Sequence, residues 1–317
     1  MARSSPGFNP VCPLGFITRI FFEELCRKNQ IINKGLHSMT HPGQLLKQRK
    51  LYAGKELGQN FLSNPDTARM IVEKTGISKN TRVLEIGSGL GALTIHIARI
   101  AYHVTAVEKD SRLIPILQQE LDTEGLKNVE IINKDVLKLD IPKLAKDNKL
   151  VVIGNLPYNI SSQILFRLIE KRTCIEKAFL MFQKELAKRI IAPPGGRDYS
   201  RLSAVVQYAA RVSHVAKIGP SSFFPKPEID STILKFDFFE TKEFDQEQEK
   251  VLFNVIKAAF SKRRKSLKNS MAGGEFKFEK DFIIQVLESA GIDAKRRAET
   301  LTVEEFKALA RAVWERS

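Results

Sequence analysis

Cysteine, histidine and long apolar runs are all scarce in this 317-residue chain, and each shortage excludes a class of protein. Three scattered cysteines are too few for a disulfide framework or a cysteine-rich zinc site. The five histidines have no metal-ligand spacing apart from His37 and His41, and that pair lies in a segment that we expect to be poorly ordered, so we expect no metal. The few, scattered cysteines fit a reducing compartment. No apolar run reaches the ~18 residues that a membrane-spanning helix needs. We therefore expect no membrane insertion and a cytoplasmic location.

Acidic residues are outnumbered by basic ones. The chain has 36 Asp and Glu against 51 Lys and Arg, which gives a net charge of +15 and a pI of about 9.7. A basic globular protein of this kind usually meets polyanions, nucleic acid above all. The length allows one large domain and a smaller one, and the hydrophobic content of 43% is sufficient for a core.

The first fifty residues carry no regular pattern. An apolar run at 13–22 is short, is interrupted by Arg19, and is followed by Glu23 and Glu24 rather than by a small-residue cleavage site. It therefore makes a poor secretory signal, and the two glutamates also argue against a transit peptide. Met39 is an alternative start. We expect residues 1–50 to be a poorly ordered N-terminal extension.

From residue 51 onward, strand-like and helix-like patterns alternate. A polar residue comes within two positions after each of four expected strands. The strands are Val83–Ile86, His103–Val107, Val129–Ile132 and Leu150–Ile153. This alternation predicts an α/β domain with a Rossmann-like, doubly wound parallel sheet over residues 51–240. From Gln246 onward the apolar spacing is helical only. We expect a small all-helical domain over residues 241–317.

A glycine-rich turn, Gly87-Ser88-Gly89-Leu90-Gly91, follows the first strand and precedes a helix. Such a turn lets a ligand approach the backbone at the positive end of a helix. Glu108 lies about 20 positions further on at a strand end, where a carboxylate can accept both hydroxyls of a ribose. Asp135 closes the third strand and can accept from an adenine amino group, while Val136 packs on the ring. The pattern predicts a cofactor with an adenosine moiety.

The fourth strand ends in Gly154-Asn155-Leu156-Pro157-Tyr158, which suits a planar base with an amino group. An adenine N6 is a poor nucleophile unless acceptors hold its hydrogens and a surface holds the ring. The Asn155 side chain and nearby carbonyls can accept, and Tyr158 can stack. The same letters also fit an ordinary turn. Phe223, on a proline-studded loop, is either a second clamp for the base or a core residue.

A basic segment follows the first helix of the C-terminal part. Its cations are Lys262, Arg263, Arg264, Lys265 and Lys268. A charge run of this kind is an electrostatic footprint for phosphates, although many such runs are only solvated surface. We expect it to bind RNA.

With these motifs in order, the chain from about Leu57 to Val313 resembles the ribosomal RNA adenine N6,N6-dimethyltransferases of the kasugamycin-resistance (KsgA-like) type. The motifs are GQNFL (58–62), EIGSGLGALT (85–94), VEKD (107–110), KDV (134–136), GNLPYNIS (154–161), FPKPEIDS (224–231) and AFSKRRKSLKN (259–269). The resemblance implies S-adenosyl-L-methionine as cofactor and N6-dimethylation of two adjacent adenosines in the 3′-terminal hairpin loop of small-subunit rRNA, in small-subunit biogenesis.

The resemblance also implies site residues. Cofactor contacts by matching position are Asn60, Leu62, Gly87, Glu108, Asp135 and Asn155. We add nearby residues to this expected cofactor site, namely Gln59, Glu85, Gly89, Lys109 and Val136. The expected target-base site consists of Asn155, Leu156, Pro157, Tyr158 and Phe223.

Three other interpretations stay open. Gly87-x-Gly89-x-x-Ala92 with Glu108 also fits a dinucleotide-dependent dehydrogenase, but no His, Lys or Tyr constellation for hydride transfer follows the fourth strand. A large-subunit rRNA methyltransferase shares most of the catalytic motifs, although Leu156 and the basic segment favour the small-subunit type. An RNA-binding assembly or transcription factor is the third. We expect a monomer whose partner is small-subunit rRNA or a partly assembled particle.

Overall fold

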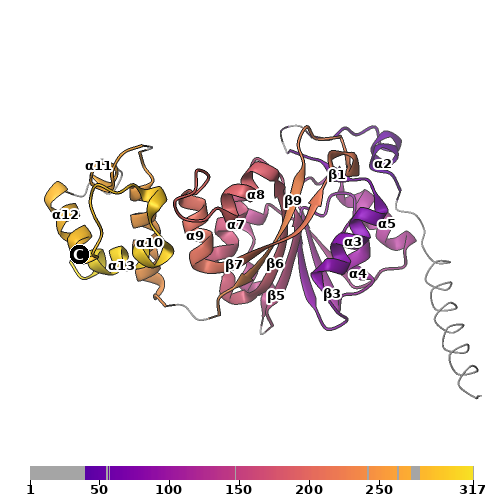
Figure 1. The fold of residues 1–317 in the computed structure, drawn as a ribbon. Coiled ribbons are helices and arrows are strands. Elements are labelled where there is room, and N and C mark those ends of the chain that lie inside the picture. Colours follow the sequence, from indigo (N-terminus) through magenta and orange to yellow (C-terminus); the bar gives the residue numbers. More distant parts are fainter. Residues whose placement is uncertain are drawn as a thin grey trace, which may run out of the picture. The chain divides into compact units, whose positions relative to one another are not determined.

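A seven-stranded sheet is the centre of the fold (Figure 1). This computed structural model describes residues 40–54, 56, 58–146, 148–240, 243–262, 264–272 and 279–316. Across the sheet the strands are β4 (Val129–Asn133), β3 (His103–Glu108), β2 (Arg82–Ile86), β5 (Leu150–Asn155), β6 (Ile175–Gln183), β9 (Ser231–Phe238) and β7 (Ala210–Ile218). The first five are parallel, and β9 runs antiparallel to both of its neighbours. The expected doubly wound α/β sheet is confirmed.

Helices cover both faces of the sheet because alternate strand residues point to opposite faces. Val83 and Val151 pack with α3 (Pro65–Thr75) and α4 (Thr94–Ala98), and α5 (Ile114–Thr123) packs beside α4. Leu84 and Val152 belong to the cluster on the other face. The helices of that cluster are α6 (Ile141–Ala145), α7 (Ser161–Glu170), α8 (Lys184–Ile191) and α9 (Arg201–Ala209). Burial on both faces explains why these strands read as continuous apolar runs.

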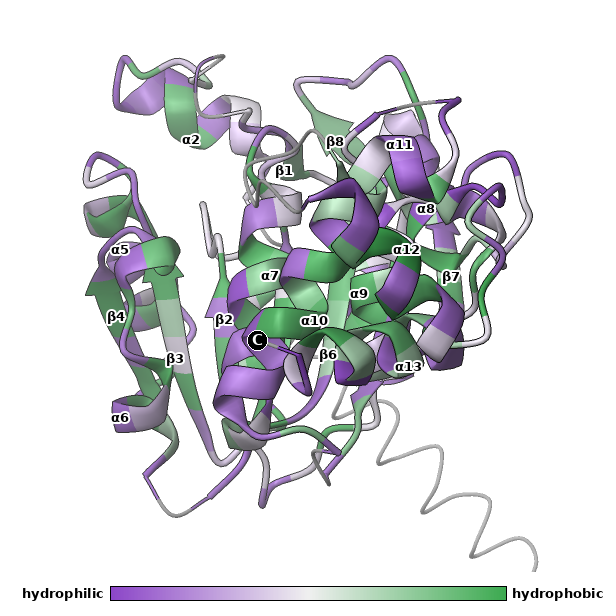
Figure 2. Ribbon diagram, turned by 90° about the vertical axis from the view of Figure 1, so that its left-hand side faces the viewer, coloured by the Kyte–Doolittle hydropathy of each residue, from purple (hydrophilic) through white to green (hydrophobic). Residues whose placement is uncertain are grey.

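The C-terminal part is helical, as expected. Its helices are α10 (Gln246–Ala259), α11 (Leu267–Met271), α12 (Lys280–Ser289) and α13 (Val303–Trp314). Asp245 and Thr302 begin α10 and α13 with capping boxes, which satisfy the first backbone N–H groups of each helix. Figure 2 shows long hydrophobic stretches on α9 and α10 as well as on the sheet.

The apolar core is continuous from the sheet into these helices, and both α10 and α13 contact α9. A buried polar group joins the two parts: Glu249 of α10 pairs with Arg172 and accepts from the Tyr208 hydroxyl of α9 at 2.9 Å. Residues 40–317 therefore form one compact unit. A domain boundary at residues 240/241 stays a prediction.

A short helix before the sheet corrects one expectation. Residues 40–50 were expected to be poorly ordered, but α2 spans Pro42–Gln48. The His41 ring nitrogen Nδ1 caps it by accepting from Gly43 N at 3.1 Å. Leu45 and Leu46 are buried with Phe61 and Leu90, so the segment is ordered by packing that is distant in sequence. Residues 1–39 lie outside the described part of the chain.

A second, small sheet consists of two strands of two residues each. In it, β1 (Phe61–Leu62) pairs antiparallel with β8 (Phe223–Phe224). The strand β1 lies directly before α3 in the sequence. Within the described ranges, no helix is long and apolar enough to cross a membrane.

Candidate functional site

A pocket opens at the carboxyl ends of β2, β3 and β5, next to β1. Ligands bind at this edge in open α/β sheets because loops from adjacent strands meet there. All residues of the expected cofactor site line this pocket: Gln59, Asn60, Leu62, Glu85, Gly87, Gly89, Glu108, Lys109, Asp135, Val136 and Asn155. The structure therefore brings together residues that are nearly a hundred positions apart.

The glycine turn is held in place by Glu108. Glu108 Oε2 accepts from Gly89 N at 2.8 Å, and Oε1 accepts from Asp110 N at 2.8 Å. Gly87 has φ +74°, and a Cβ at this position would lie 3.3 Å from the Asn155 carbonyl oxygen. Glycine thus allows the turn to lie against the loop after β5.

Glu108 keeps acceptor capacity for a ligand. Burial raises the pKa of Glu108, while the N–H groups of Asp110 and Gly89 oppose that rise by stabilising the carboxylate. Each carboxylate oxygen accepts one backbone N–H and retains a further lone pair. A vicinal diol such as the 2′ and 3′ hydroxyls of a ribose can donate to both.

Glu85 is the most strongly perturbed acid in the pocket. It is 1% exposed, and its Oε2 has no hydrogen-bond partner among the described residues. Burial raises the pKa of Glu85 to about 8, and the charge of Glu108 adds to the rise. The buried Ser88 hydroxyl, also on the pocket wall, has no partner in the same part of the chain. Unsatisfied polar atoms at this wall fit a ligand with hydrogen-bond donors and positive charge.

Asp135 stays ionised at the pocket edge. Its Oδ2 lies 2.9 Å from Lys109 Nζ, and its Oδ1 accepts from Leu137 N at 3.0 Å. The Lys109 contact is the main reason that the pKa of Asp135 is lowered. Val136 follows at once and is buried beside it, so the pair offers an acceptor and an apolar surface to a purine.

The loop after β5 presents acceptors in a fixed orientation. Asn155 Nδ2 donates to the Asn60 carbonyl at 2.9 Å, which leaves Oδ1 without a donor from the described residues. The Pro157 carbonyl accepts from Ile160 N at 3.2 Å, so it is already engaged. The Leu156 carbonyl accepts from no group in the described ranges. Asn155 Oδ1 and the Leu156 carbonyl are therefore acceptors of this loop that no donor in the described residues engages.

Tyr158 lines the pocket beside these acceptors, together with Leu156 and Pro157. Its hydroxyl lies 2.9 Å from the Ser231 hydroxyl. Asn159, which had not been predicted, also lines the pocket and donates from Nδ2 to the Glu56 carbonyl at 3.2 Å. Ser88, Phe61 and Leu90 were likewise missed as lining residues. For Ser88, its place inside the glycine turn was an available signal.

Phe223 is not part of the pocket. It is 4% exposed and packs in the cluster that contains Leu62, its partner in the β1–β8 pair. Neighbouring strand residues point to opposite faces, so Phe224 is the exposed one and its ring lies against His41. In this structure Phe223 occupies the core position that had been its alternative, and its interpretation as a base clamp stays a prediction.

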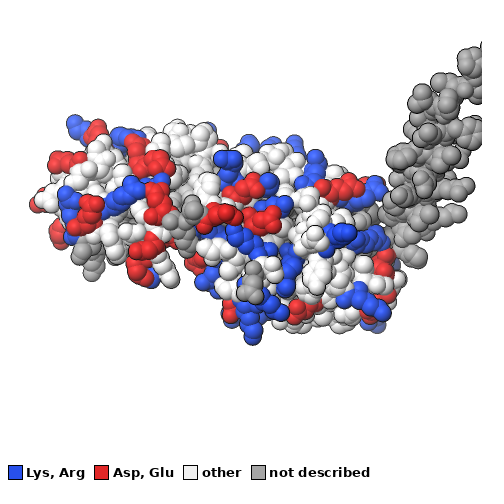
Figure 3. Space-filling model, turned by 90° about the horizontal axis from the view of Figure 1, so that it is seen from below, with Lys and Arg blue, Asp and Glu red and all other residues white. Residues whose placement is uncertain are grey.

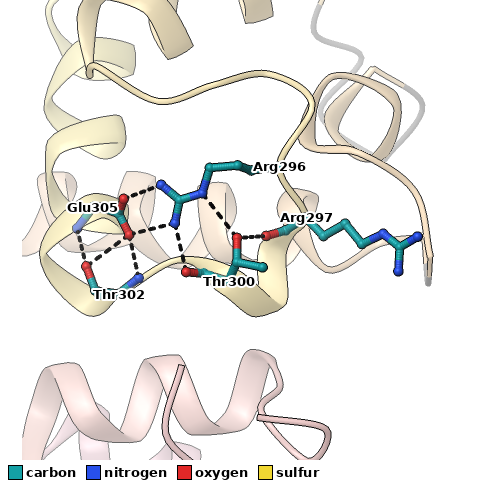
Figure 4. Close-up of polar contacts among 5 residues, drawn as sticks. All are labelled: Arg296, Arg297, Thr300, Thr302 and Glu305. Carbon is teal, nitrogen blue, oxygen red and sulfur yellow. Dashed lines mark hydrogen bonds and ion pairs between the residues drawn. The ribbon is translucent and has the colours of Figure 1, made fainter. Parts of the chain in front are cut away.

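The basic segment is presented by a hydrogen-bonded frame. Ser261 Oγ donates to the Ser270 carbonyl at 2.7 Å, and Leu267 N donates to the Arg296 carbonyl at 2.7 Å. Arg296 is itself fixed by Glu305 and by the Thr300 carbonyl, as Figure 4 shows. The start of the segment is thereby attached to α11, and its end to the loop before α13.

Most of the described cations of the segment are exposed. Lys262, Arg264 and Lys265 are exposed, Lys268 is half-buried, and Arg263 lies outside the described residues. Within the described ranges none of these four has an acidic partner. Figure 3 shows acidic side chains interspersed among basic ones over one face. Cations without acidic partners, on a segment held by hydrogen bonds, are therefore a more specific indication of phosphate binding than net charge.

In the described residues, no group of three or more His, Cys, Asp or Glu side chains is arranged to hold a metal ion. The expected absence of a metal, the monomeric state and the cytoplasmic location stay predictions.

A Rossmann-like sheet with a glycine turn, Glu108 and the Asn155 loop beside one pocket is the arrangement expected of the methyltransferase class. The family model for ribosomal RNA adenine dimethylase matches residues 51–309, and the chain belongs to this family. It therefore uses S-adenosyl-L-methionine as methyl donor. The expectations of a methyltransferase and of this cofactor are confirmed, and the dehydrogenase interpretation is excluded.

Several proteins with similar sequences or structures are also methyltransferases. The ribosomal RNA small subunit methyltransferase A of Desulforapulum autotrophicum is 58% identical over 87% of this chain and 97% of its own length. The protein of the same name from Alkaliphilus oremlandii is 40% identical over 84% and 94%. Among solved structures, a dimethyladenosine transferase from Plasmodium falciparum has a TM-score of 0.68 at 30% identity, covering 78% of this chain and 95% of that one. The 23S rRNA methyltransferase ErmE has a TM-score of 0.59 at 25% identity, with 80% and 98% covered.

Proposed function

We propose that this protein transfers methyl groups to N6 of two adjacent adenosines in the 3′-terminal hairpin loop of small-subunit rRNA and so acts in small-subunit biogenesis. The orientation of Asn155 supports this most directly. Its amide nitrogen is engaged by Asn60, and its oxygen is left as an acceptor beside the cofactor pocket. The 58% identity to a small-subunit enzyme supports the choice of rRNA.

The cofactor residues divide into three groups by chemistry. Glu108 holds the ribose, and Asp135 with Val136 holds the adenine. Glu85, with its unpartnered oxygen, lies on the wall that suits the charged end of the molecule. When bound, S-adenosyl-L-methionine supplies an electrophilic methyl group next to the Asn155 loop.

The loop after β5 then activates the target base. The adenosine leaves its stack, which takes little free energy in a single-stranded loop. Tyr158 holds the ring by stacking worth ~1–3 kcal/mol. Asn155 Oδ1 and the Leu156 carbonyl accept the two N6 hydrogens, which keeps electron density on the nitrogen as it is methylated. The nitrogen then loses a proton to solvent, so no dedicated base is required.

Substitution of Asn155 tests this proposal. Asn155→Ala removes the acceptor and the hydrogen bond to Asn60, so we expect methyl transfer to fall by about 10²-fold or more, as when a comparable transition-state hydrogen bond is removed. The assay uses tritiated S-adenosyl-L-methionine and small ribosomal subunits that lack the dimethylation, and primer extension locates the label. Asn80→Ala, an exposed residue outside the pocket, is the control and should keep full activity.

Two results would overturn the proposal. Label only in large-subunit rRNA would support a methyltransferase that acts on 23S rRNA, as ErmE does. Binding of both ligands by the wild-type protein without any transfer would support a role as an assembly factor.

A further inference from the structure

The first residue of β9 carries a buried hydroxyl that faces the target-base loop. Ser231 is 0% exposed and lies in a strand paired on both sides, opposite Gln183 of β6 and Ile218 of β7. Its hydroxyl has one hydrogen-bond partner among the described residues, the Tyr158 hydroxyl at 2.9 Å. The buried position of Ser231, in a strand paired on both sides, therefore restricts where its hydroxyl oxygen can lie.

Tyr158, the other partner in this hydrogen bond, lies in a loop rather than in the sheet. The Tyr158 carbonyl accepts from the Ser161 hydroxyl at 3.1 Å, which holds the backbone but not the ring. The ring has only two side-chain torsions, and fixing its oxygen fixes the first of them, which sets the direction of the ring axis. If the ring turned away, the buried Ser231 hydroxyl would lose its partner, and an unsatisfied buried hydroxyl is unfavourable. The contact therefore disfavours conformations in which the ring axis points away from Ser231.

We propose that Ser231 is a positioning residue that holds the Tyr158 ring ready to stack on the target adenine. This inference rests on the proposed function. A ring that is already oriented loses less conformational freedom when the base arrives, so the contact strengthens base binding without touching the substrate. The pair is separated by 73 positions in the sequence, and it connects the Asn155–Tyr158 loop to the first residue of β9.

The experiment is a double-mutant cycle with Ser231→Ala and Tyr158→Phe. Tyr158→Phe keeps the stacking ring and removes only the hydroxyl, so both variants delete the same hydrogen bond. We expect each to raise the KM for RNA about 3- to 10-fold, as for removal of one hydrogen bond, with a smaller change in kcat. The double variant should be impaired no more than either single variant. Ser213→Ala, a serine on neighbouring β7 outside the pocket, is the matched control and should behave as wild type.

A second readout separates positioning from a merely structural role. With 2-aminopurine at the target position of the RNA hairpin, we expect less quenching by stacking in Ser231→Ala than in wild type, while the affinity for S-adenosyl-L-methionine is unchanged. Additive effects in the cycle, or wild-type quenching in Ser231→Ala, would overturn the inference. Absence of methyl transfer by wild-type protein would instead count against the proposed function. The coupling of the two hydroxyls in thermal unfolding would still be measurable in that case.

Discussion

At the scale of single residues, Glu85 is a buried acid on the wall of the pocket. A carboxyl group that is 1% exposed with one oxygen unpartnered among the described residues is unusual in a folded protein. Its neutral form is the more stable one while the pocket holds no cation, because burial disfavours the charge. The same feature that makes this wall suitable for a cationic ligand therefore makes the stability of the fold dependent on pH.

This dependence can be measured. The ordinary pKa of the carboxyl is 4.5, and in the folded chain it is about 8, so the folded state binds this proton more tightly than the unfolded state. The contribution of Glu85 to stability is complete below pH 4.5 and disappears as pH rises to about 8. Glu85→Gln imitates the protonated form and should remove this part of the decline in the free energy of unfolding.

The measurement is urea unfolding at several pH values between about 5 and about 8.5, without cofactor, a range that spans the titration. Glu228→Gln, a substitution of the same chemistry outside the pocket, is the control and should leave the pH profile of the wild type unchanged. Identical profiles for Glu85→Gln and wild type would contradict the assignment of a protonated Glu85.

At the scale of elements, the pocket depends on how closely β2 and β5 approach each other. Gly154 is the last residue but one of β5 and lies opposite Ile86 of β2. A Cβ at Gly154 would lie 2.9 Å from the Ile86 carbonyl oxygen and 2.9 Å from Leu156 Cδ2. One of these atoms belongs to the backbone of a neighbouring strand, which cannot rotate away.

Gly154→Ala should therefore separate the two strands at the edge that holds the pocket. We expect a decrease of ~1–3 kcal/mol in the free energy of unfolding, as for other overpacked sites, together with weaker cofactor binding. Urea unfolding and calorimetric titration measure the two effects. Gly219→Ala, where the nearest atom to a new Cβ is 3.9 Å away, is the control. A fully stable Gly154→Ala protein with normal cofactor affinity would show that the strands can adjust.

At the scale of the whole molecule, we expect only part of the net charge of +15 to contribute to RNA binding. Many surface cations are paired with acids, whereas those of the basic segment have no acidic partner in the described part of the chain. If these cations bind phosphates, they should account for part of the salt dependence of RNA binding.

The double variant Lys262→Gln, Lys265→Gln tests this. We expect weaker binding of the rRNA hairpin, and a salt slope reduced by about 0.7 to 0.9 for each phosphate that the variant no longer neutralises. Cofactor affinity should not change, because neither lysine lines the pocket. Filter binding between about 50 and about 300 mM salt, a range that brackets physiological ionic strength, measures the slope. The control Lys79→Gln, Lys127→Gln removes the same charge near the amino ends of β2 and β4; equally weakened binding in both variants would indicate a non-specific effect of charge.

The sequence by itself determined the sheet and most of the pocket. Strand, glycine turn and helix are local patterns, and parallel strands necessarily bring their carboxyl ends to one edge. Gly87, Glu108, Asp135 and Asn155 were therefore predictable as neighbours in space, although they are far apart in the chain.

Only the tertiary structure decided the orientation of particular side chains. Whether Phe223 or Phe224 faces inward depends on the register of the β1–β8 pair, two residues long and set by contacts across the chain. The order of α2 depends on Leu45 and Leu46 meeting Phe61 and Leu90. The burial of Glu85 and the hydrogen bond between Tyr158 and Ser231 likewise arise from distant segments. No local pattern encodes them, because burial and hydrogen-bond partners are properties of the assembled fold.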